Sequence, residues 1–378
     1  MSENGIPIHK VSTISSALTA KYQNTIIKTM FRVNTSKSAG AKSATNHTTN
    51  KLEQTAENTF SRALDTSRET VTSRQYNKKD KILVICGPTA TGKTRFGLDL
   101  AKKLNGEIVS ADSRQVYTGR NIVTGKDLPK NIQCSVSNIQ WRDRYLKYYE
   151  IGGIKIWLYD IVEQGEEFSV ALWRECAQLV IEDIRQRGGL PIVVGGTGLY
   201  IKSLTQNLAD ISVSRNLKLR QELQGKNVNY LFNYLKQRDP VRAQNLNESD
   251  RRNPRRLVRA IEIASQNAKP QKDTPFNPER SILDILQIGL TAPKEELYRR
   301  VDKRVDNRIA AGAAGEDSIL SANPQLWKLQ EKKIVRQQIT WFKKQPSISW
   351  FDITLENWQP EAEDIVGKWY NNPDAKKG

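Results

Sequence analysis

The eight residues from Gly87 to Thr94, GPTATGKT, have the composition of a phosphate-binding loop. Two glycines let the backbone bring its N–H groups close to an anion, Lys93 adds a positive charge, and the Thr94 hydroxyl can ligate Mg²⁺. The apolar run KILVIC precedes the loop and a helical pattern follows it, which is the setting that the motif requires. Kinases, GTPases and other transferases share such loops, so the motif predicts phosphate binding without identifying the phosphate compound.

Two more groups of polar residues follow apolar runs. Asp112 closes the run EIVSAD, and Thr197 stands in GGTGLYIKSL (195–204), directly after LPIVV. Asp112 is suited to holding Mg²⁺ through water, to accepting a proton from a nucleophile, or simply to capping a turn or helix. Because parallel strands present their carboxyl ends at one edge of a sheet, we expect both groups to meet the phosphate loop in one crevice.

The two histidines and three cysteines restrict the available chemistry. His9 and His47 both lie in the first 80 residues, so a folded body that begins after them has no histidine for a triad, a metal site or a general base. The cysteines form no C-x-x-C pair, which argues against a disulfide framework and favours a reducing compartment. The chemistry must then come from Asp, Glu, Lys, Arg, Thr or a bound cation.

The chain is strongly basic. Its formal charge is +18, of which residues 1–80 contribute +6 and the remainder +12. Such a body suits a polyanionic partner, most plausibly nucleic acid, although a solvated lysine-rich surface would have the same composition. No apolar run approaches the length that spans a bilayer. We expect a cytoplasmic monomer that contacts no membrane.

The hydrophobic pattern predicts an α/β fold. Strand-like runs at 81–86, 107–112, 154–162 and 190–196 alternate with helical patterns, the longest of which covers 169–187. This order predicts a parallel sheet flanked by helices, as in P-loop NTPases. Residues 1–80 read as a disordered extension with short helices around 15–32 and 52–72; the scarcity of acidic residues in 1–50 only weakly favours an organelle transit peptide. The expected segments after it are a first part of the core at 81–204, a helical insertion at 205–250, a core completion with a strand at 286–290 and basic helices at 251–345, and a C-terminal tail at 346–378.

The motifs taken together resemble the tRNA dimethylallyltransferase (isopentenyltransferase) family. The resemblance is carried by GPTATGKT, SADSRQVYTGRNIVTGK (110–126) and LPIVVGGTGLYIKSL (190–204), and later by DRRNPRRLVRAIEI (250–263), APKEELYRRVDKRVDNRI (292–309) and RQQITWFKK (336–344). It covers roughly residues 81–345. It implies transfer of a dimethylallyl group from dimethylallyl diphosphate to N6 of the adenosine just 3′ of the tRNA anticodon, a base that must first be extruded from its loop.

The resemblance also implies roles for individual residues. Lys93, Thr89 and Arg304 would stabilise the leaving diphosphate, with Mg²⁺ on Thr94, and Asp112 would take the proton of the adenine amino group. The helical insertion and the arginine-rich helix at 254–263 would bind the tRNA anticodon stem-loop. The loop residues concerned are Gly87, Pro88, Thr89, Ala90, Thr91, Gly92, Lys93 and Thr94. The tRNA-binding residues implied are Asp112, Ser113, Arg114, Gln115, Thr197, Arg220, Arg255, Arg256, Leu257, Val258 and Arg259.

Two basic helices are predicted in detail. Asn253 is a good N-cap with Pro254 at the first helical position, which aligns Arg255 and Arg259 on one face; a purely solvated charged face is the alternative. In YRRVDKRVDNRI, Arg300, Arg304 and Arg308 recur every four residues. For Arg300 an intrahelical ion pair with Glu296 is as plausible as a ligand contact.

Departures from the family pattern leave alternatives open. The stretch IWLYDIV keeps Asp160 but lacks the family's preceding histidine pair, the family's Gly-Tyr segment is not evident between Ala313 and Trp327, and no zinc finger is present. The alternatives are an adenylate isopentenyltransferase acting on free nucleotides, a P-loop small-molecule kinase, and a non-catalytic RNA-binding relic. The basic body argues against the first, the absence of a recognisable arginine lid against the second, and the presence of Lys93 and Asp112 against the third.

Overall fold

The structure is a computed structural model that describes residues 80–206, 208–211, 213–267 and 284–372. The predictions for residues 1–79, a disordered extension with short helices around 15–32 and 52–72, lie outside the described residues. No helix in the described part of the chain is long and apolar enough to cross a membrane.

The described residues build one eight-stranded sheet with the order β3-β4-β5-β2-β6-β1-β7-β8. The strands from β5 to β8 in this order run parallel, whereas β3, β4 and β5 are joined in antiparallel pairs. The sheet therefore confirms the predicted α/β class, and the β3–β4 hairpin is an addition that we did not predict. The strands are β1 (Lys81–Cys86), β2 (Gly106–Ser110), β3 (Cys134–Trp141), β4 (Arg144–Ile151), β5 (Ile154–Trp157), β6 (Leu190–Gly195), β7 (Asp284–Thr291) and β8 (Ser349–Asp352).

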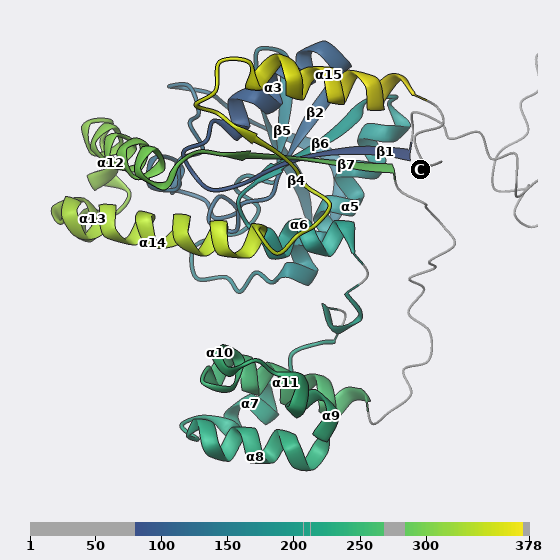
Figure 1. Ribbon diagram of the computed structural model, residues 1–378, viewed down its shortest axis with the longest axis vertical. Helices are drawn as coiled ribbons and strands as arrows, with labels where there is room; N and C mark the ends of the chain where they lie inside the picture. The colour runs from purple at the N-terminus through teal and green to yellow at the C-terminus, as the bar shows by residue number, and fades with distance from the viewer. Residues whose placement is uncertain (1–79, 207, 212, 268–283, 373–378) are drawn as a thin grey trace, which may run out of the picture. The chain divides into compact units, whose positions relative to one another are not determined.

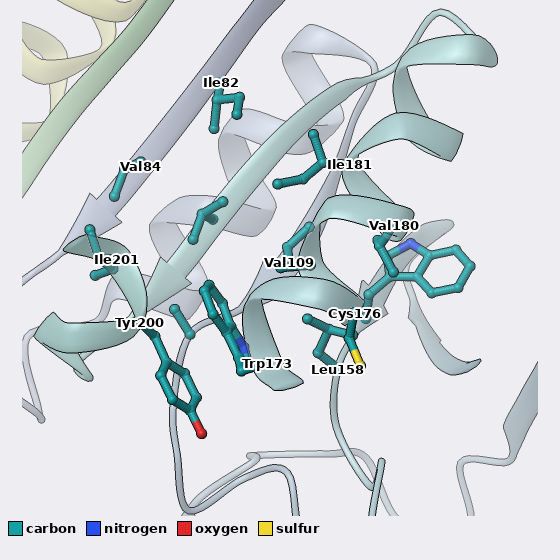
Figure 2. Packing of buried hydrophobic residues seen from close by; sticks show 14 of the residues in the cluster. Ile82, Val84, Val109, Leu158, Trp173, Cys176, Val180, Ile181, Tyr200 and Ile201 are labelled. Carbon is teal, nitrogen blue, oxygen red and sulfur yellow. The ribbon is translucent and has the colours of Figure 1, made fainter. Parts of the chain in front are cut away.

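Both faces of the sheet are buried, which explains the unbroken apolar runs in the sequence. Along β1, Ile82 and Val84 face one core, while Leu83 and Ile85 face the other, because successive side chains alternate between faces. Helices α5 (Val170–Gln186) and α6 (Gly198–Thr205) cover the first core, and helices α3 (Lys93–Leu104) and α15 (Trp358–Asn371) cover the second (Figure 1). Figure 2 shows residues of α5 and α6 packed against the strands in the first core.

The last residues of the described chain belong to this core. We predicted a C-terminal tail from residue 346, but β8 pairs in parallel with β7, and α15 buries Ala362, Val366 and Trp369. The prediction is wrong because SWFD is too short for a period-2 pattern to stand out and because the polar residues of α15 mask its apolar face. At the start of β7, the Trp369 indole N–H and the buried Lys81 ammonium both donate hydrogen bonds to the Asp284 carboxylate.

Helices α12 (Lys294–Ala310) and α14 (Pro324–Phe342) follow β7 and pack on each other. Between them lie a short 3₁₀ turn, η4 (Ala313–Gly315), and α13 (Ser318–Ala322). A small cluster of buried residues joins this region to the segment after β2: Val123, Val305, Ala313 and Trp327. The short helix in that segment is α4 (Asn121–Thr124).

The helical insertion has its own core. Its helices are α7 (Leu217–Leu223), α8 (Val228–Arg238), α9 (Pro240–Asn245), α10 (Glu248–Arg251) and α11 (Pro254–Asn267), preceded by a short 3₁₀ turn, η3 (Ala209–Ile211). Leu257 and Ile261 of α11 pack with Leu231 and Leu235 of α8. The predicted boundary at residue 250 is therefore wrong: α11 belongs to the insertion, because its apolar stripe is complementary to α8.

Candidate active site

The phosphate loop leaves β1 at Cys86 and ends in the first turn of α3. Gly87 has a φ of +130°, and a Cβ there would lie 2.1 Å from the Leu290 carbonyl oxygen of β7, so only glycine allows this close approach. The Lys93 ammonium folds over the loop and donates to the Pro88 carbonyl oxygen at 2.5 Å. The loop therefore has the shape that the sequence motif predicts.

The ammonium of Lys93 occupies an unfavourable position for a cation. Burial lowers its pKa to about 8, and the nearby Arg304 guanidinium adds to this, while the negative charge of Asp112 opposes the shift. Two cations facing one space are stabilised by an anion placed between them. The arrangement therefore favours binding of a polyanion beside the loop.

Asp112 and Thr197 lie together at the carboxyl ends of β2 and β6. The Asp112 Oδ1 accepts the Arg114 backbone N–H at 2.9 Å, and the Thr197 hydroxyl oxygen accepts the Ser113 N–H at 2.9 Å. Among the described residues, no protein group donates to the other carboxylate oxygen, Oδ2. One oxygen of Asp112 is thus fixed by the backbone, and the second is left for a ligand.

Arg304 of α12 closes the crevice on the other side of the loop. Its guanidinium donates to the Thr89 hydroxyl at 3.1 Å, to the Gly125 carbonyl at 3.0 Å and to the Asp127 carboxylate at 2.7 Å. Gln115 donates to the same Gly125 carbonyl at 2.9 Å. Gly125 has a φ of +65°, and a Cβ there would lie 2.4 Å from Arg304 Nη2. The Gly125 carbonyl oxygen therefore fixes the side chains of Arg304 and Gln115 relative to each other.

A buried ion pair supports this segment. Lys126 donates to Asp160 and, at 2.8 Å, to Asn121, while Tyr149 donates to the second oxygen of Asp160 at 2.6 Å. The antiparallel strand β4 supplies Tyr149, so the unpredicted hairpin contributes to the site. In this chain a tyrosine hydroxyl and a lysine thus fix Asp160, although the histidine pair of the family pattern is absent.

Two adjoining cavities meet at Asp112. The larger, of about 470 Å³, lies beside the phosphate loop, and the smaller, of about 270 Å³, lies beside α14; Asp112 and Gly196 line both. The larger cavity includes Asp127 and the cations Lys93, Arg95, Arg299, Arg300, Lys303 and Arg304. The smaller is walled by Thr197, Trp341 and Phe342. One cavity is strongly cationic and the other partly aromatic, with a carboxylate between them.

Sequence reasoning missed Gln338, which connects the two sides of the site. Its amide oxygen accepts the Thr89 N–H at 2.8 Å, and its amide nitrogen donates to the Gly196 carbonyl at 3.0 Å. The block RQQITWFKK drew attention to this stretch, but a glutamine on a helix carries no chemical signature of its own. The only available signal was the resemblance itself.

The arginines predicted to bind RNA divide into two groups. The Asn253 cap is confirmed, since its side chain accepts the Arg255 N–H at 3.0 Å, and the Arg255 and Arg256 side chains are exposed. Arg220 and Arg259 instead pair with the buried Glu262, at 2.6 and 3.2 Å, within the insertion. Leu257 is buried in that core, so its side chain offers nothing to RNA, and Val258 packs against the same core.

The predicted metal site has few protein ligands. No group of three or more His, Cys, Asp or Glu residues that could hold a metal ion occurs among the described residues. Thr94, Asp112 and Asp127 do line the larger cavity. This donor set fits Mg²⁺, which commonly binds proteins through one or two side-chain oxygens and completes its shell with substrate phosphates and water.

The fold and the site define a P-loop α/β protein whose loop faces a cationic cavity and, across a carboxylate, a second cavity with an aromatic wall. Family models described as "Isopentenyl transferase" and "IPP transferase" match residues 80–148 and 146–331. The tRNA dimethylallyltransferase of Acetivibrio thermocellus is 35% identical over 72% of this chain and 92% of its own length. That of Anoxybacillus flavithermus is 33% identical over 73% and 91%. The chain belongs to the tRNA dimethylallyltransferase family.

Solved structures agree with this assignment. The tRNA isopentenylpyrophosphate transferase of Bacillus halodurans is 27% identical, with a TM-score of 0.50 over 78% of this chain and 98% of that one. A eukaryotic dimethylallyltransferase described as acting on tRNA is 23% identical, with a TM-score of 0.58 over 77% and 79%. The second likeness establishes the common fold.

Proposed function

We propose that this protein transfers a dimethylallyl group from dimethylallyl diphosphate to N6 of the adenosine adjacent to the 3′ side of the anticodon in tRNA. The observation that carries the proposal is the position of Asp112 between the cationic cavity and the aromatic-walled one. The transfer requires a departing diphosphate and an incoming amino group to meet, and the relatives of this chain are named tRNA dimethylallyltransferases.

The cationic cavity accounts for the leaving group. The allylic C–O bond breaks as negative charge grows on the diphosphate, and preorganised cations lower the energy of that state. The Lys93 ammonium donates to the Pro88 carbonyl of the loop and the Arg304 guanidinium donates to Thr89, so the phosphate oxygens would replace contacts that these groups make with the protein. Bound Mg²⁺, with Thr94 as a ligand, would neutralise additional charge on the diphosphate.

The smaller cavity accounts for the acceptor. An adenine extruded from its loop can stack on the Trp341 ring and present its amino group to the free Oδ2 of Asp112. The aromatic amine is a weak nucleophile, so orientation by a fixed carboxylate contributes more than bulk basicity. Asp112 accepts the amino proton as the new C–N bond forms.

Transfer RNA is a better acceptor than a free nucleotide on electrostatic grounds. The chain outside residues 1–80 carries a formal charge of +12, and Arg255 and Arg256 are exposed on α11. A mononucleotide offers too few phosphates to engage a surface of this extent.

The experiment is a transfer assay with dimethylallyl diphosphate, Mg²⁺ and a tRNA anticodon stem-loop, followed by mass spectrometry of the nucleosides. We expect N6-dimethylallyladenosine, and no product with AMP or ATP as the acceptor. Asp112→Asn keeps the oxygen that binds the Arg114 N–H but removes the charge, so turnover should fall by roughly 10²–10⁴-fold with RNA binding nearly unchanged. Asp364→Asn, an exposed carboxylate on α15 paired with Lys368, is the matched control. Undiminished turnover in Asp112→Asn would refute the role of Asp112.

A further inference from the structure

A buried carboxylate next to the site takes no part in the mechanism above. Glu331 of α14 is only 4% exposed, and its Oε1 accepts a hydrogen bond from Arg114 Nη1 at 2.6 Å. The same oxygen lies 3.8 Å from Nη1 of Arg308, a residue that is 5% exposed. Among the described residues, none of the three guanidinium nitrogens of Arg308 has a hydrogen-bond partner. One carboxylate therefore faces two arginines and hydrogen-bonds only one of them.

Arg114 links this carboxylate to Asp112. Its backbone N–H holds Asp112 Oδ1, and its guanidinium lies in the field of both Asp112 and Glu331. An arginine and a carboxylate with a free oxygen form strong, often bidentate, hydrogen bonds. If Glu331 did not hold the Arg114 guanidinium, that group would be free to pair with Asp112 Oδ2, the atom that the adenine amino group requires.

We propose that Glu331 is a positioning residue that keeps the Arg114 guanidinium off the Asp112 carboxylate, so that Oδ2 stays open for the acceptor amine. This inference rests on the proposed function. Arg308 places a second positive charge 3.8 Å from the Glu331 carboxylate. The absence of a side chain at Gly125 leaves room for the Arg308 guanidinium, since a Cβ on residue 125 would lie 2.0 Å from Arg308 Nη2.

The charge state of Glu331 agrees with this role. Burial alone would raise the pKa of its carboxyl, but Arg114, Arg308 and Arg304 together hold that pKa below its usual value. Glu331 is therefore ionised at neutral pH and remains a strong acceptor for Arg114.

The test compares variants at saturating stem-loop RNA and dimethylallyl diphosphate. Glu331→Gln combined with Arg308→Met removes the carboxylate without leaving the buried Arg308 guanidinium facing a neutral residue, and it leaves Arg114 in place. We expect at least a tenfold loss of kcat with the Kd for RNA changed less than threefold. Arg308→Met alone should stay within twofold of the parent, because the 2.6 Å bond between Arg114 and Glu331 persists.

The decisive step is a rescue. Adding Arg114→Met to the double variant removes the guanidinium that we infer to pair with Asp112 Oδ2 when Glu331 is absent. The kcat should then rise again by at least threefold. A merely structural role of Glu331 would not produce this recovery. Glu331→Asp, which retains the charge but shortens the side chain, should lower kcat as well and decides the matter if the double variant fails to fold. Full activity in Glu331→Asp, or no rescue by Arg114→Met in a folded double variant, would overturn the inference. Absence of product in the unaltered protein would instead refute the proposed function.

Discussion

Replacing Arg308 by methionine should make the protein more stable. The guanidinium is buried in the described structure with its three nitrogens unpaired, and its distance of 3.8 Å from Glu331 is too long for a hydrogen bond. Burial lowers the Arg308 pKa well below its ordinary value, to about 10, with repulsion from Arg304 and Arg114 adding to the shift and attraction from Glu331 opposing it. A shift of this size means that the folded state disfavours the charge by about 3 kcal/mol.

The sign of the effect follows from the proton balance. The unfolded chain holds the Arg308 proton more tightly than the folded one, so the penalty is present in full at pH 7 and declines only as the pH rises above 10. Methionine removes the charge and fills a similar space beside Trp327, whose ring lies 5.9 Å from the guanidinium carbon. Glu331 keeps its partner Arg114, so no orphan carboxylate is created.

We therefore expect the free energy of unfolding at pH 7 to rise by about 1–3 kcal/mol in Arg308→Met, the lower values allowing for lost attraction to Glu331. Guanidinium chloride unfolding, monitored by tryptophan fluorescence, measures this as a higher midpoint with an unchanged slope. The control is Arg299→Met on the same helix, whose exposed side chain should change stability by no more than about 0.5 kcal/mol. An Arg308→Met protein less stable than its parent would refute the reasoning, because Arg308 would then be satisfied by a partner that the geometry does not show.

Three further outcomes are expected. Gly125→Ala places a Cβ 2.4 Å from Arg304 Nη2 and should displace that guanidinium, so titration calorimetry should show weaker dimethylallyl diphosphate binding. An unchanged affinity would contradict the proposal that Arg304 binds the diphosphate. Because the Lys93 pKa of about 8 is that of the free enzyme, the Kd of this ligand should rise about fivefold from pH 8 to pH 9, and a flat profile would contradict the role of the ammonium. Asp284→Asn leaves buried Lys81 without its carboxylate at 2.6 Å, and should cost about 3–5 kcal/mol in denaturant unfolding, with a loss below 1 kcal/mol counting against the pair.

The central part of the fold was predictable because local signals agreed with tertiary structure. The apolar runs that became β1 and β6 are buried on both faces, so their composition already excludes a half-exposed strand. The loop at 87–94 joins such a strand to a helix, and the registers Cys86↔Gly195 and Ser110↔Val194 then bring Asp112 and Thr197 to it. Because these strands are parallel, the phosphate loop, Asp112 and Thr197 all follow strand ends at the same edge of the sheet and line one crevice.

The misses have a common physical origin. β8 is only four residues long, and the strands of the β3–β4 hairpin mix exposed, half-buried and buried residues without strict alternation, so neither gives a strong periodic pattern. The stripe of α11 indicates an apolar face but not its partner, which is why the helix was wrongly divided from the insertion. Amphipathic patterns specify that a face is buried and leave open what covers it.

The site shows the same limit at the level of single residues. Glycine at 125 reads as a turn residue in the sequence, and arginine at 308 as one more member of a four-residue repeat. In three dimensions the two depend on each other, because the absent Cβ is the space that the Arg308 guanidinium takes, and Glu331 arrives there from a helix more than twenty residues later. A residue whose role is to hold another residue has no chemical signature in the sequence, because that role depends on a contact with a residue far away along the chain. The variants of Arg308 and Glu331 are informative for this reason: they separate groups that touch the reactants from groups that decide where those groups point.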